Sequence, residues 1–141
     1  MSEPLYSIDI LRLAAATADF PRLATPDATV DRRSVTCGSR ISVDLMIDNA
    51  GQVIAYGHQV NACALGQAAA TLFARHAVGL TAADIATARD ELSQWLADGD
   101  APRPLWSDIG LLERARGYSA RHGSIRLAFE ATADAMQQVT R

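Results

Sequence analysis

Residues 37–68 read CGSRISVDLMIDNAGQVIAYGHQVNACALGQA and contain the clearest structural signal in the chain. From residue 41 to residue 48 every second position is apolar, which is the period of two expected of a half-buried β-strand. The apolar positions are Ile41, Val43, Leu45 and Ile47. Asp48–Gly51 then provides a turn, because Asn and Gly both tolerate positive φ. We expect Val53–Val60 to return as an antiparallel strand, so this stretch predicts a β-hairpin.

The residues before the hairpin predict one helix and one further strand. Tyr6–Thr17 has a mixed apolar pattern that favours a short helix ending before Pro21. Ala28–Val35 has a β-like composition, and its polar run Asp31–Arg33 indicates an edge strand or a solvated one. The sheet is therefore expected to contain about three strands.

Everything after Asn61 is expected to be helical. The predicted helices are Cys63–Val78, ended by Gly79; a second helix capped by Thr81 and ending near Gly99; a short helix from Ser107 to Ala115, broken by Gly117; and an amphipathic helix from about Ser124 to Val139. Together these elements predict an α+β fold, in which a small antiparallel sheet packs against C-terminal helices. We expect residues 1–141 to form a single domain.

Length and charge narrow the class of protein. A chain of 141 residues can bury one core without disulfides or metal. Its net charge of -3 and its pI of about 5.5 argue against nucleic-acid binding, which normally needs a basic face. The N-terminus lacks the features of a signal peptide, and no apolar run reaches the roughly 18 residues of a membrane span. We therefore expect a soluble, cytoplasmic protein that binds neither nucleic acid nor membranes.

Cys37 and Cys63 are the two cysteines of the chain, and they flank the predicted hairpin. Because a hairpin returns the chain, both thiols should lie at the same end of the sheet. Cys63 begins a helix, where amide donors and the helix dipole lower the pKa of a thiol and favour metal binding or sulfur transfer. Cys37 precedes Gly38 in a loop that can adapt to a ligand. The alternative is that both cysteines are small core residues.

These features resemble the IscU/SufU family of iron-sulfur cluster assembly scaffolds, whose fold is of the SufE/NifU type. The family's pattern is Cys-Gly-Asp before a strand, a hairpin with a short polar turn, and a second Cys that opens an Ala/Ser-rich helix. The matching segments here are Cys37–Ser39, Asp48–Gly51 and Asn61–Ala68. The long segment between Val78 and Arg121 is similar to the SufU branch of the family. The resemblance covers nearly the whole chain.

Two positions depart from the family's pattern. Ser39 stands where the family has an aspartate, and the family's third cysteine falls here on Gly123 or Ser124. We favour Ser124, because Arg121 then keeps the family's basic residue three positions earlier. A neutral serine hydroxyl is a poor ligand for zinc or for an iron-sulfur cluster. The resemblance therefore implies a metal site that is incomplete in this chain.

The resemblance implies a scaffold or a sulfur acceptor in iron-sulfur cluster assembly rather than a classical enzyme. It implies Cys37 and Cys63 as ligands of a cluster or of an iron or zinc ion, Cys63 as a persulfide acceptor, and a cysteine desulfurase as the partner that supplies sulfur. Three arrangements are open. In the first, a zinc ion is held by Cys37, Cys63 and His122. In the second, two chains share a cluster and contribute two thiolates each. In the third, the site is vestigial and the chain is a non-catalytic interaction protein.

The three histidines also have structural interpretations. His58 shares a strand face with Tyr56, which favours a satisfied, partly buried side chain. His76 lies near the C-terminus of a helix, where a cation interacts well with the dipole. For His122, an ordinary surface or capping histidine is the alternative to a metal ligand.

Overall fold

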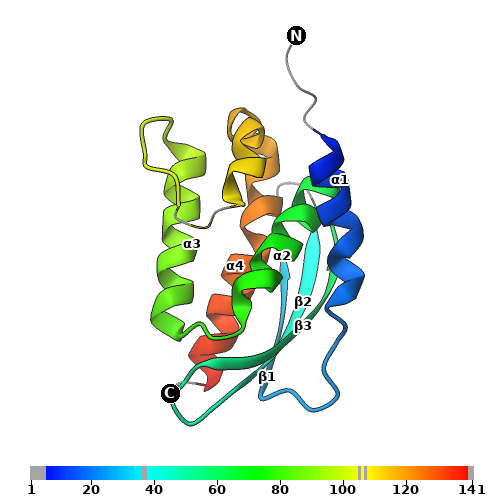
Figure 1. The fold of residues 1–141 in the computed structure, drawn as a ribbon, viewed down its shortest axis with the longest axis vertical. Helices are drawn as coiled ribbons and strands as arrows, with labels where there is room; N and C mark the ends of the chain where they lie inside the picture. The colour runs from blue at the N-terminus through cyan, green and yellow to red at the C-terminus, as the bar shows by residue number, and fades with distance from the viewer. Residues whose placement is uncertain (1–5, 36–37, 105, 107, 140–141) are drawn as a thin grey trace.

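The computed structural model describes residues 6–35, 38–104, 106 and 108–139 (Figure 1). Its elements, in chain order, are α1 (Ile8–Ala15), the 3₁₀ helix η1 (Ala16–Asp19), β1 (Ala28–Arg33), β2 (Arg40–Ile47), β3 (Val53–Asn61), α2 (Ala64–Ala77), α3 (Ala82–Ala97), the 3₁₀ helix η2 (Ile109–Gly117) and α4 (Ser119–Val139). The three strands form one antiparallel sheet in the order β1-β2-β3. The predicted α+β class is confirmed.

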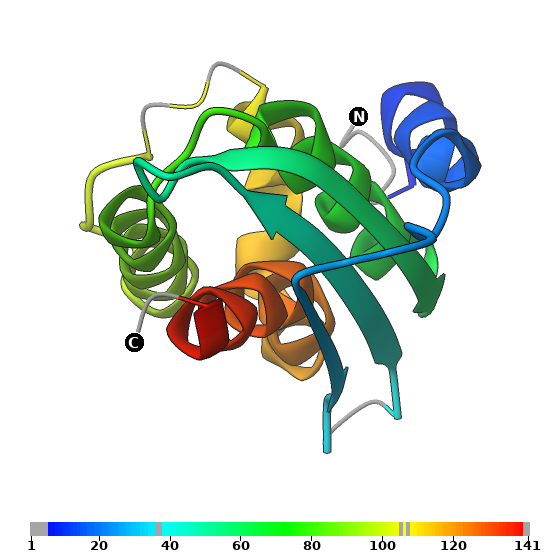
Figure 2. The same ribbon diagram turned by 90° about the horizontal axis from the view of Figure 1, so that it is seen from below.

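The register of the sheet separates an apolar face from a polar one. Val30 pairs with Val43, and Val43 pairs with His58, so these side chains share the face that α2 and α4 cover. The neighbouring positions in each strand point the other way, because the side-chain period of a strand is two. We call this second side the outer face. Figure 2 shows the twist of the sheet, with α3 and α4 on one side of it.

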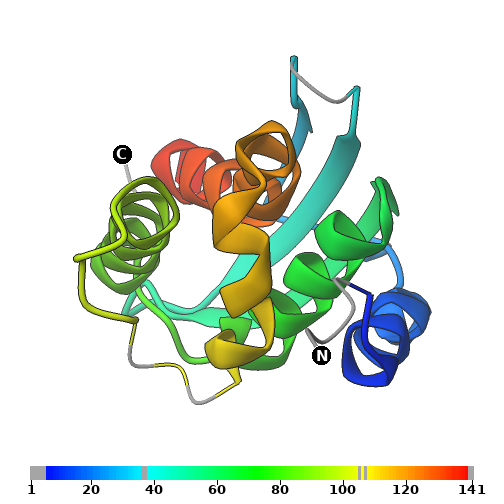
Figure 3. The same ribbon diagram turned by 90° about the horizontal axis from the view of Figure 1, so that it is seen from above.

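The helices form one layer, in which α2 and α4 lie between α1 and α3 (Figures 1 and 3). Local signals set their starts: Ser7 caps α1, and Thr81 with Asp84 forms a capping box at the start of α3. Ala-rich α2 is buried along most of its length, because it packs on α1, α4 and β3. The core between the layers is one continuous apolar cluster, with Phe73, Trp95 and Phe129 fully buried.

The segment between η1 and β1 covers part of the outer face. The amide of His58 donates to the carbonyl of Phe20 at 2.9 Å, and Gly57 lies so close to this segment that an added Cβ would be 2.1 Å from the Pro21 carbonyl oxygen. Arg22 donates to buried Asp44 at 2.6 and 3.0 Å. This segment covers the outer face around Asp44, whereas Arg33, Arg40 and Asn61 at the other end of this face stay exposed among the described residues.

Two predicted helices differ from the structure. The last helix begins at Ser119 rather than at Ser124, so Arg121–Ser124 lies inside its first two turns. Gly123 therefore lies within α4. The position has no room for a side chain, because a Cβ there would lie 2.5 Å from the Ser34 hydroxyl oxygen. The segment predicted as Ser107–Ala115 is a 3₁₀ helix that begins at Ile109, and Ser107 itself lies outside the described residues.

The remaining predicted elements are confirmed within one or two residues at most ends, with the first helix shorter than expected and continued by η1. His58 is buried, as its strand face indicated, and both ring nitrogens have partners, the Tyr56 hydroxyl and the Thr17 carbonyl, each at 3.0 Å. Among the helices formed by the described residues, none combines the length and apolarity needed to cross a membrane.

Candidate functional site

Cys63 occupies the N-cap position of α2, directly after β3 ends at Asn61. Burial acts to raise the pKa of its thiol, but the amides of Gly66 and Leu65, the Ser124 hydroxyl and the Arg121 guanidinium act in the other direction. Their combined effect lowers the pKa below its ordinary value. The thiolate is the nucleophilic and metal-binding form of cysteine, so this position activates the thiol.

Two serines lie beside this thiol. The Ser124 hydroxyl is 3.7 Å from the Cys63 sulfur and 2.9 Å from the Ser39 hydroxyl. Both serines are buried, with exposed fractions of 4% for Ser39 and 2% for Ser124. The fold thus brings together residues from the loop before β2, the start of α2 and the second turn of α4. Ser39, Cys63 and Ser124 are three of the positions that the sequence singled out.

Gly123 and Ser124, the two candidates for the last of these positions, have different neighbours. Ser124 faces Cys63 and Ser39, whereas Gly123 faces Ser34. Gly66 makes the contact possible, because a Cβ at this position would lie 2.1 Å from the Ser124 hydroxyl oxygen. Sequence reasoning missed the role of Gly66. Its one signal was a glycine inside an otherwise Ala-rich helix, where a close approach is a common reason for glycine.

Arg121 and Tyr6 form the rim of the site. Arg121 donates to the Tyr6 hydroxyl at 2.6 Å, and its guanidinium carbon lies 5.9 Å from the centre of the Tyr6 ring. The contact with Cys63 raises the pKa of Arg121 further above its already high ordinary value, so the guanidinium stays charged beside the thiol. The sequence indicated Arg121 only through the family pattern and gave no signal for Tyr6.

His122 has a structural role in the described contacts. Its side chain is 8% exposed, and its Nε2 lies 3.1 Å from the carbonyl oxygen of Ala115 and 2.9 Å from that of Arg116. One ring N–H therefore serves the last carbonyls of η2 and joins η2 to α4. Only Nδ1 is left for any other partner.

The described residues of the site include few side chains that can ligate a metal ion. Among the residues that the structure describes, no group of three or more His, Cys, Asp or Glu side chains could hold a metal ion. Cys37, the other predicted ligand, lies outside the described residues. The described part of the site offers one thiol, two neutral hydroxyls and one guanidinium, which is a nucleophile with hydrogen-bond donors rather than a complete set of ligands.

His76 belongs to a separate cluster at the C-terminal end of α2, opposite the end that begins at Cys63. Its Nε2 lies 3.0 Å from a carboxylate oxygen of Asp108, and its ring stacks on Trp106 with 4.5 Å between centroids. No contact of this cluster with Cys63 is seen in the described residues. Its evident effect is to hold the segment before η2 against α2.

The comparisons with known proteins identify the family. A search with models of known protein families finds no match, and neither does a search of the curated proteins. Among solved structures, a nitrogen-fixing NifU-like protein (N-terminal) from Brucella abortus is 36% identical, with a TM-score of 0.88 over 96% of this chain and 94% of that one. The chain belongs to the NifU-like N-terminal family.

Another solved structure has the same fold as this NifU-like chain at lower identity. It comes from Fervidobacterium islandicum AW-1 and is assigned as an iron-sulfur cluster assembly scaffold for the SUF system. It is 13% identical with a TM-score of 0.83, covering 94% of this chain and 96% of that one. The resemblance to iron-sulfur scaffold proteins, first seen around Cys37 and Cys63, is confirmed for the fold and the family.

Proposed function

We propose that this NifU-like chain works in iron-sulfur cluster assembly, where Cys63 accepts sulfur and, with Cys37, holds the nascent cluster. The observation that carries the proposal is the environment of Cys63: a thiol of lowered pKa at the start of α2, beside Arg121 and Ser124. Family membership and the scaffold assignment of the Fervidobacterium neighbour support the same role.

The partner in this proposal is a cysteine desulfurase, which carries a persulfide on its own cysteine. The Cys63 thiolate attacks the outer sulfur of that persulfide and forms a new S–S bond. The S–S bond of the donor breaks, and its electron pair leaves with the donor's thiolate. No outside oxidant or reductant is consumed. Arg121 favours the attacking thiolate, because its positive charge lies beside Cys63.

The assembled cluster is the cargo of the protein in this scheme. Clusters are commonly held by four thiolates, and one chain has two cysteines. Ser39 and Ser124 donate and accept hydrogen bonds but replace thiolate or carboxylate poorly. We therefore favour a cluster shared by two chains, which supplies four thiolates, over a zinc ion held by Cys37, Cys63 and His122, which offers two thiolates and the Nδ1 of His122.

Sulfur acceptance is tested by incubating the protein with a cysteine desulfurase and cysteine, then trapping persulfides by alkylation. Intact-mass and peptide analysis should find one added sulfur atom on Cys63 in the wild type and in Cys37→Ser, and none in Cys63→Ser. Labelling of Cys37 alone would assign the acceptor role to the other cysteine. No added sulfur on either would contradict the proposal.

Cluster holding needs a separate experiment. After reconstitution with iron and sulfide, iron content and apparent mass by size-exclusion chromatography should both fall in the double variant Cys37→Ser, Cys63→Ser. A shared cluster predicts that the cluster-loaded fraction elutes as two chains. Equal iron in the double variant would exclude the two thiols as ligands.

A second function is favoured by one specific contact. The buried Ser39–Ser124 hydrogen bond at 2.9 Å occupies two positions where the family pattern has metal ligands. A non-catalytic interaction protein that keeps the scaffold fold would show this arrangement. It predicts desulfurase binding of equal affinity in the wild type and the double cysteine variant, with neither sulfur transfer nor cluster in either.

A further inference from the structure

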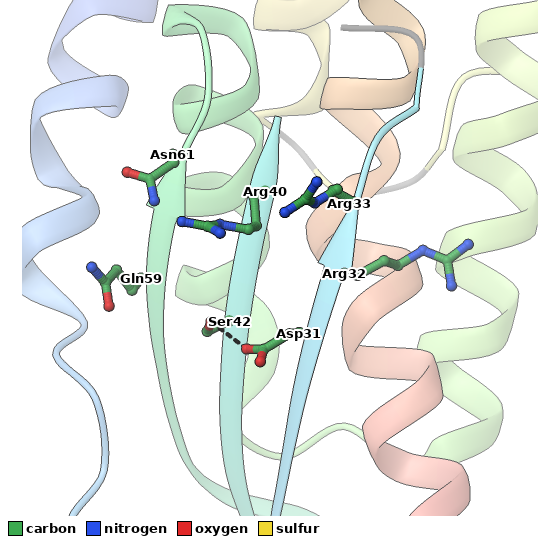
Figure 4. Close-up of a pocket in the computed structure, with 7 residues that line it drawn as sticks. All are labelled: Asp31, Arg32, Arg33, Arg40, Ser42, Gln59 and Asn61. Atoms are coloured by element: carbon green, nitrogen blue, oxygen red, sulfur yellow. Dashed lines mark hydrogen bonds between the residues drawn. The ribbon is translucent and has the colours of Figure 1, made fainter. Parts of the chain in front are cut away.

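The uncovered part of the outer face contains a polar hollow. Its volume is about 360 Å³, and residues of all three strands line it (Figure 4). The segment that crosses the sheet at Pro21 and Arg22 stops short of it. The site of Cys63 lies at the N-terminal ends of α2 and α4, so this hollow is a separate surface, and none of the residues that the structure describes covers it.

Two arginines face each other across strands at this hollow. Arg33 of β1 is the register partner of Arg40 of β2, and Arg40 is the partner of Asn61 of β3. These three residues form what we call the arginine row, and all three are exposed. Like charges directly opposite one another destabilise a sheet. No ion pair joins either arginine to another residue of the described chain, so the repulsion is not relieved internally.

Arg32, the neighbour of Arg33, has counter-charges within the chain. Its side chain points away from the other residues of the hollow in Figure 4, and it contacts α4, with 2.6 Å to Asp134 and 3.6 Å to Glu130. The contrast between neighbouring Arg32 and Arg33 suggests that the arginine row serves a partner outside the chain.

Other charges around the hollow define where an anion can bind. Asp31 lies in the next row of the outer face, and its carboxylate accepts a hydrogen bond from Ser42 (Figure 4). Arg22 is attracted electrostatically by Asp31, but its guanidinium forms its ion pair with Asp44. Asp31 repels anions from the middle of the hollow, so the favourable end is the arginine row, next to the 34–39 loop.

We propose that the arginine row binds side-chain carboxylates of an acidic segment in a protein partner. Neighbouring strands lie about 4.8 Å apart, so Arg33 and Arg40, whose side chains are long and rotatable, can each donate to a different carboxylate of one acidic segment. Val35, just beyond the row, is 98% exposed, and an exposed apolar residue beside charges suits a protein surface better than a small anion. The chain as a whole carries a net charge of -3, so attraction for an acidic partner must come from a local patch.

The position of the row suggests which partner docks there. Asn61 is two residues before Cys63, and Arg40 follows Ser39, so an occupant of the row lies next to the sulfur-accepting site. Resting on the proposed function, we identify the occupant as an acidic segment of the protein that donates sulfur. The row would orient that donor without taking part in the transfer step.

Binding is tested directly with labelled hexaglutamate and hexaglutamine peptides, measured by fluorescence anisotropy at low salt. We expect the glutamate peptide to bind and the glutamine peptide not to bind. Since the variant loses two exposed ion pairs with the peptide, Arg33→Gln with Arg40→Gln should weaken binding about tenfold. The control pair Arg12→Gln, Arg103→Gln removes the same charge elsewhere and should leave the affinity unchanged. Equal loss in both pairs, or competition by inorganic phosphate beyond that of chloride at equal ionic strength, would overturn the proposal.

The role of the row in sulfur transfer is tested with two donors. With a cysteine desulfurase as donor, the Arg33→Gln, Arg40→Gln variant should label Cys63 more slowly, and added salt should slow the wild type towards the same rate. With a small-molecule persulfide as donor, the two proteins should react at the same rate. Equal rates with the desulfurase would overturn the docking role. Failure of Cys63 to accept sulfur from either donor would instead refute the proposed function, and the peptide measurement would still decide the binding site.

The variant should fold normally, because it removes a like-charge pair from an exposed position. Its circular dichroism and thermal midpoint are expected to equal or exceed those of the wild type. A large loss of stability would show that Arg33 and Arg40 are structural, and would overturn the proposal.

Discussion

At the scale of single residues, the candidate site is built around Cys63. Four groups act on the thiol against the effect of burial, and two of them, Ser124 and Arg121, come from α4. The N-terminus of a helix by itself lowers the pKa of a thiol to some degree. The contacts from α4 lower the pKa of Cys63 further, and each can be removed by a single substitution.

The first prediction concerns Arg121. Arg121→Gln removes a positive charge beside the thiol, so the pKa of Cys63 should rise and the thiolate fraction at pH 7 should fall. In a Cys37→Ser background, alkylation by iodoacetamide should be several-fold slower at pH 7, and the pH midpoint of the rate should move upward. Arg103→Gln, on the exposed surface, is the control. An unchanged midpoint would show that Arg121 does not act on the thiol.

The second prediction concerns the two serines at the site. In Ser39→Asp, Ser124→Cys the hydroxyls are replaced by a carboxylate and a thiol next to Cys63, which are ligand types that zinc prefers. Zinc retained after purification without chelator should increase from a trace to about one ion per chain. Ser93→Asp, Ser119→Cys introduces the same residue types on α3 and at the exposed first residue of α4, and should retain no more than the wild type. Equal zinc in both variants would contradict the geometry of the site.

At the scale of elements, two close approaches fix how the layers meet. One joins α2 to α4 at Gly66, and the other joins the segment after η1 to the sheet at Gly57 and Asp44. Neither approach was predicted from the sequence, although the strands and helices themselves were. Periodicity identifies which face of an element is buried, but it does not identify which residue of a distant element lies against it.

The third prediction is that Gly66→Ala destabilises the protein even though alanine is the better helix former. The added methyl group would lie 2.1 Å from the Ser124 hydroxyl oxygen and 2.8 Å from the Ala62 Cβ, so these groups must shift, at about 1–3 kcal/mol in the free energy of unfolding. Urea denaturation measures the change. Ser124→Gly in the same chain should recover part of the loss, whereas Gly117→Ala, with open space around it, should be close to neutral. A stabilised Gly66→Ala would show that this approach is looser than described.

The fourth prediction concerns the pH dependence contributed by Asp44. Although burial acts to raise the pKa of this carboxyl, hydrogen bonds from Arg22, Thr29 and the Leu23 amide lower it below its ordinary value. The carboxylate therefore stabilises the fold fully above the unfolded-state pKa of about 3.9, and this contribution is lost as the pH falls through the lower folded-state value.

Asp44→Asn should consequently cost about 1–3 kcal/mol at pH 7, because the groups around Asp44 lose a charged acceptor. The variant should also lose less stability than the wild type between neutral pH and pH 2. Urea titrations across that range provide the measurement, with Asp90→Asn, which is exposed, as the control. A variant whose curve runs parallel to that of the wild type would rule out Asp44 as the titrating group.

At the scale of the whole molecule, one apolar core links the sheet to the helical layer. Residues of all three strands and of α1, α2, α3, η2 and α4 contribute to it. This continuity favours a single cooperative unit, which is the organisation that length alone led us to expect.

The fifth prediction follows from that continuity. Unfolding followed by far-ultraviolet circular dichroism and by tryptophan fluorescence should give coincident transitions, because Trp95 is buried in the same core that orders the strands. Trp106→Phe isolates the signal of Trp95 for this comparison. Two separated transitions would mean that part of the chain unfolds independently.

The sequence by itself determined the β-hairpin, the capped N-terminus of α3 and the position of Cys63 at the N-terminus of α2. These features depend on residues close together in the chain, such as the alternation of 41–47 and the Thr81–Asp84 capping box. Local periodicity and capping are set by backbone geometry over a few residues, so a single sequence carries them.

Only the tertiary structure decided that Ser124, not Gly123, faces the thiol and that His122 joins η2 to α4. It also decided that Arg33 and Arg40 oppose each other, with no ion pair to either among the described residues. The Ser124 contacts join residues 61 and 85 positions apart. Such contacts depend on how the helical layer is placed on the sheet, and many sequences with the same local patterns would place it differently. The physical reason is that packing at Gly66 and Gly123, rather than any local preference, sets the distance between α4 and its neighbours.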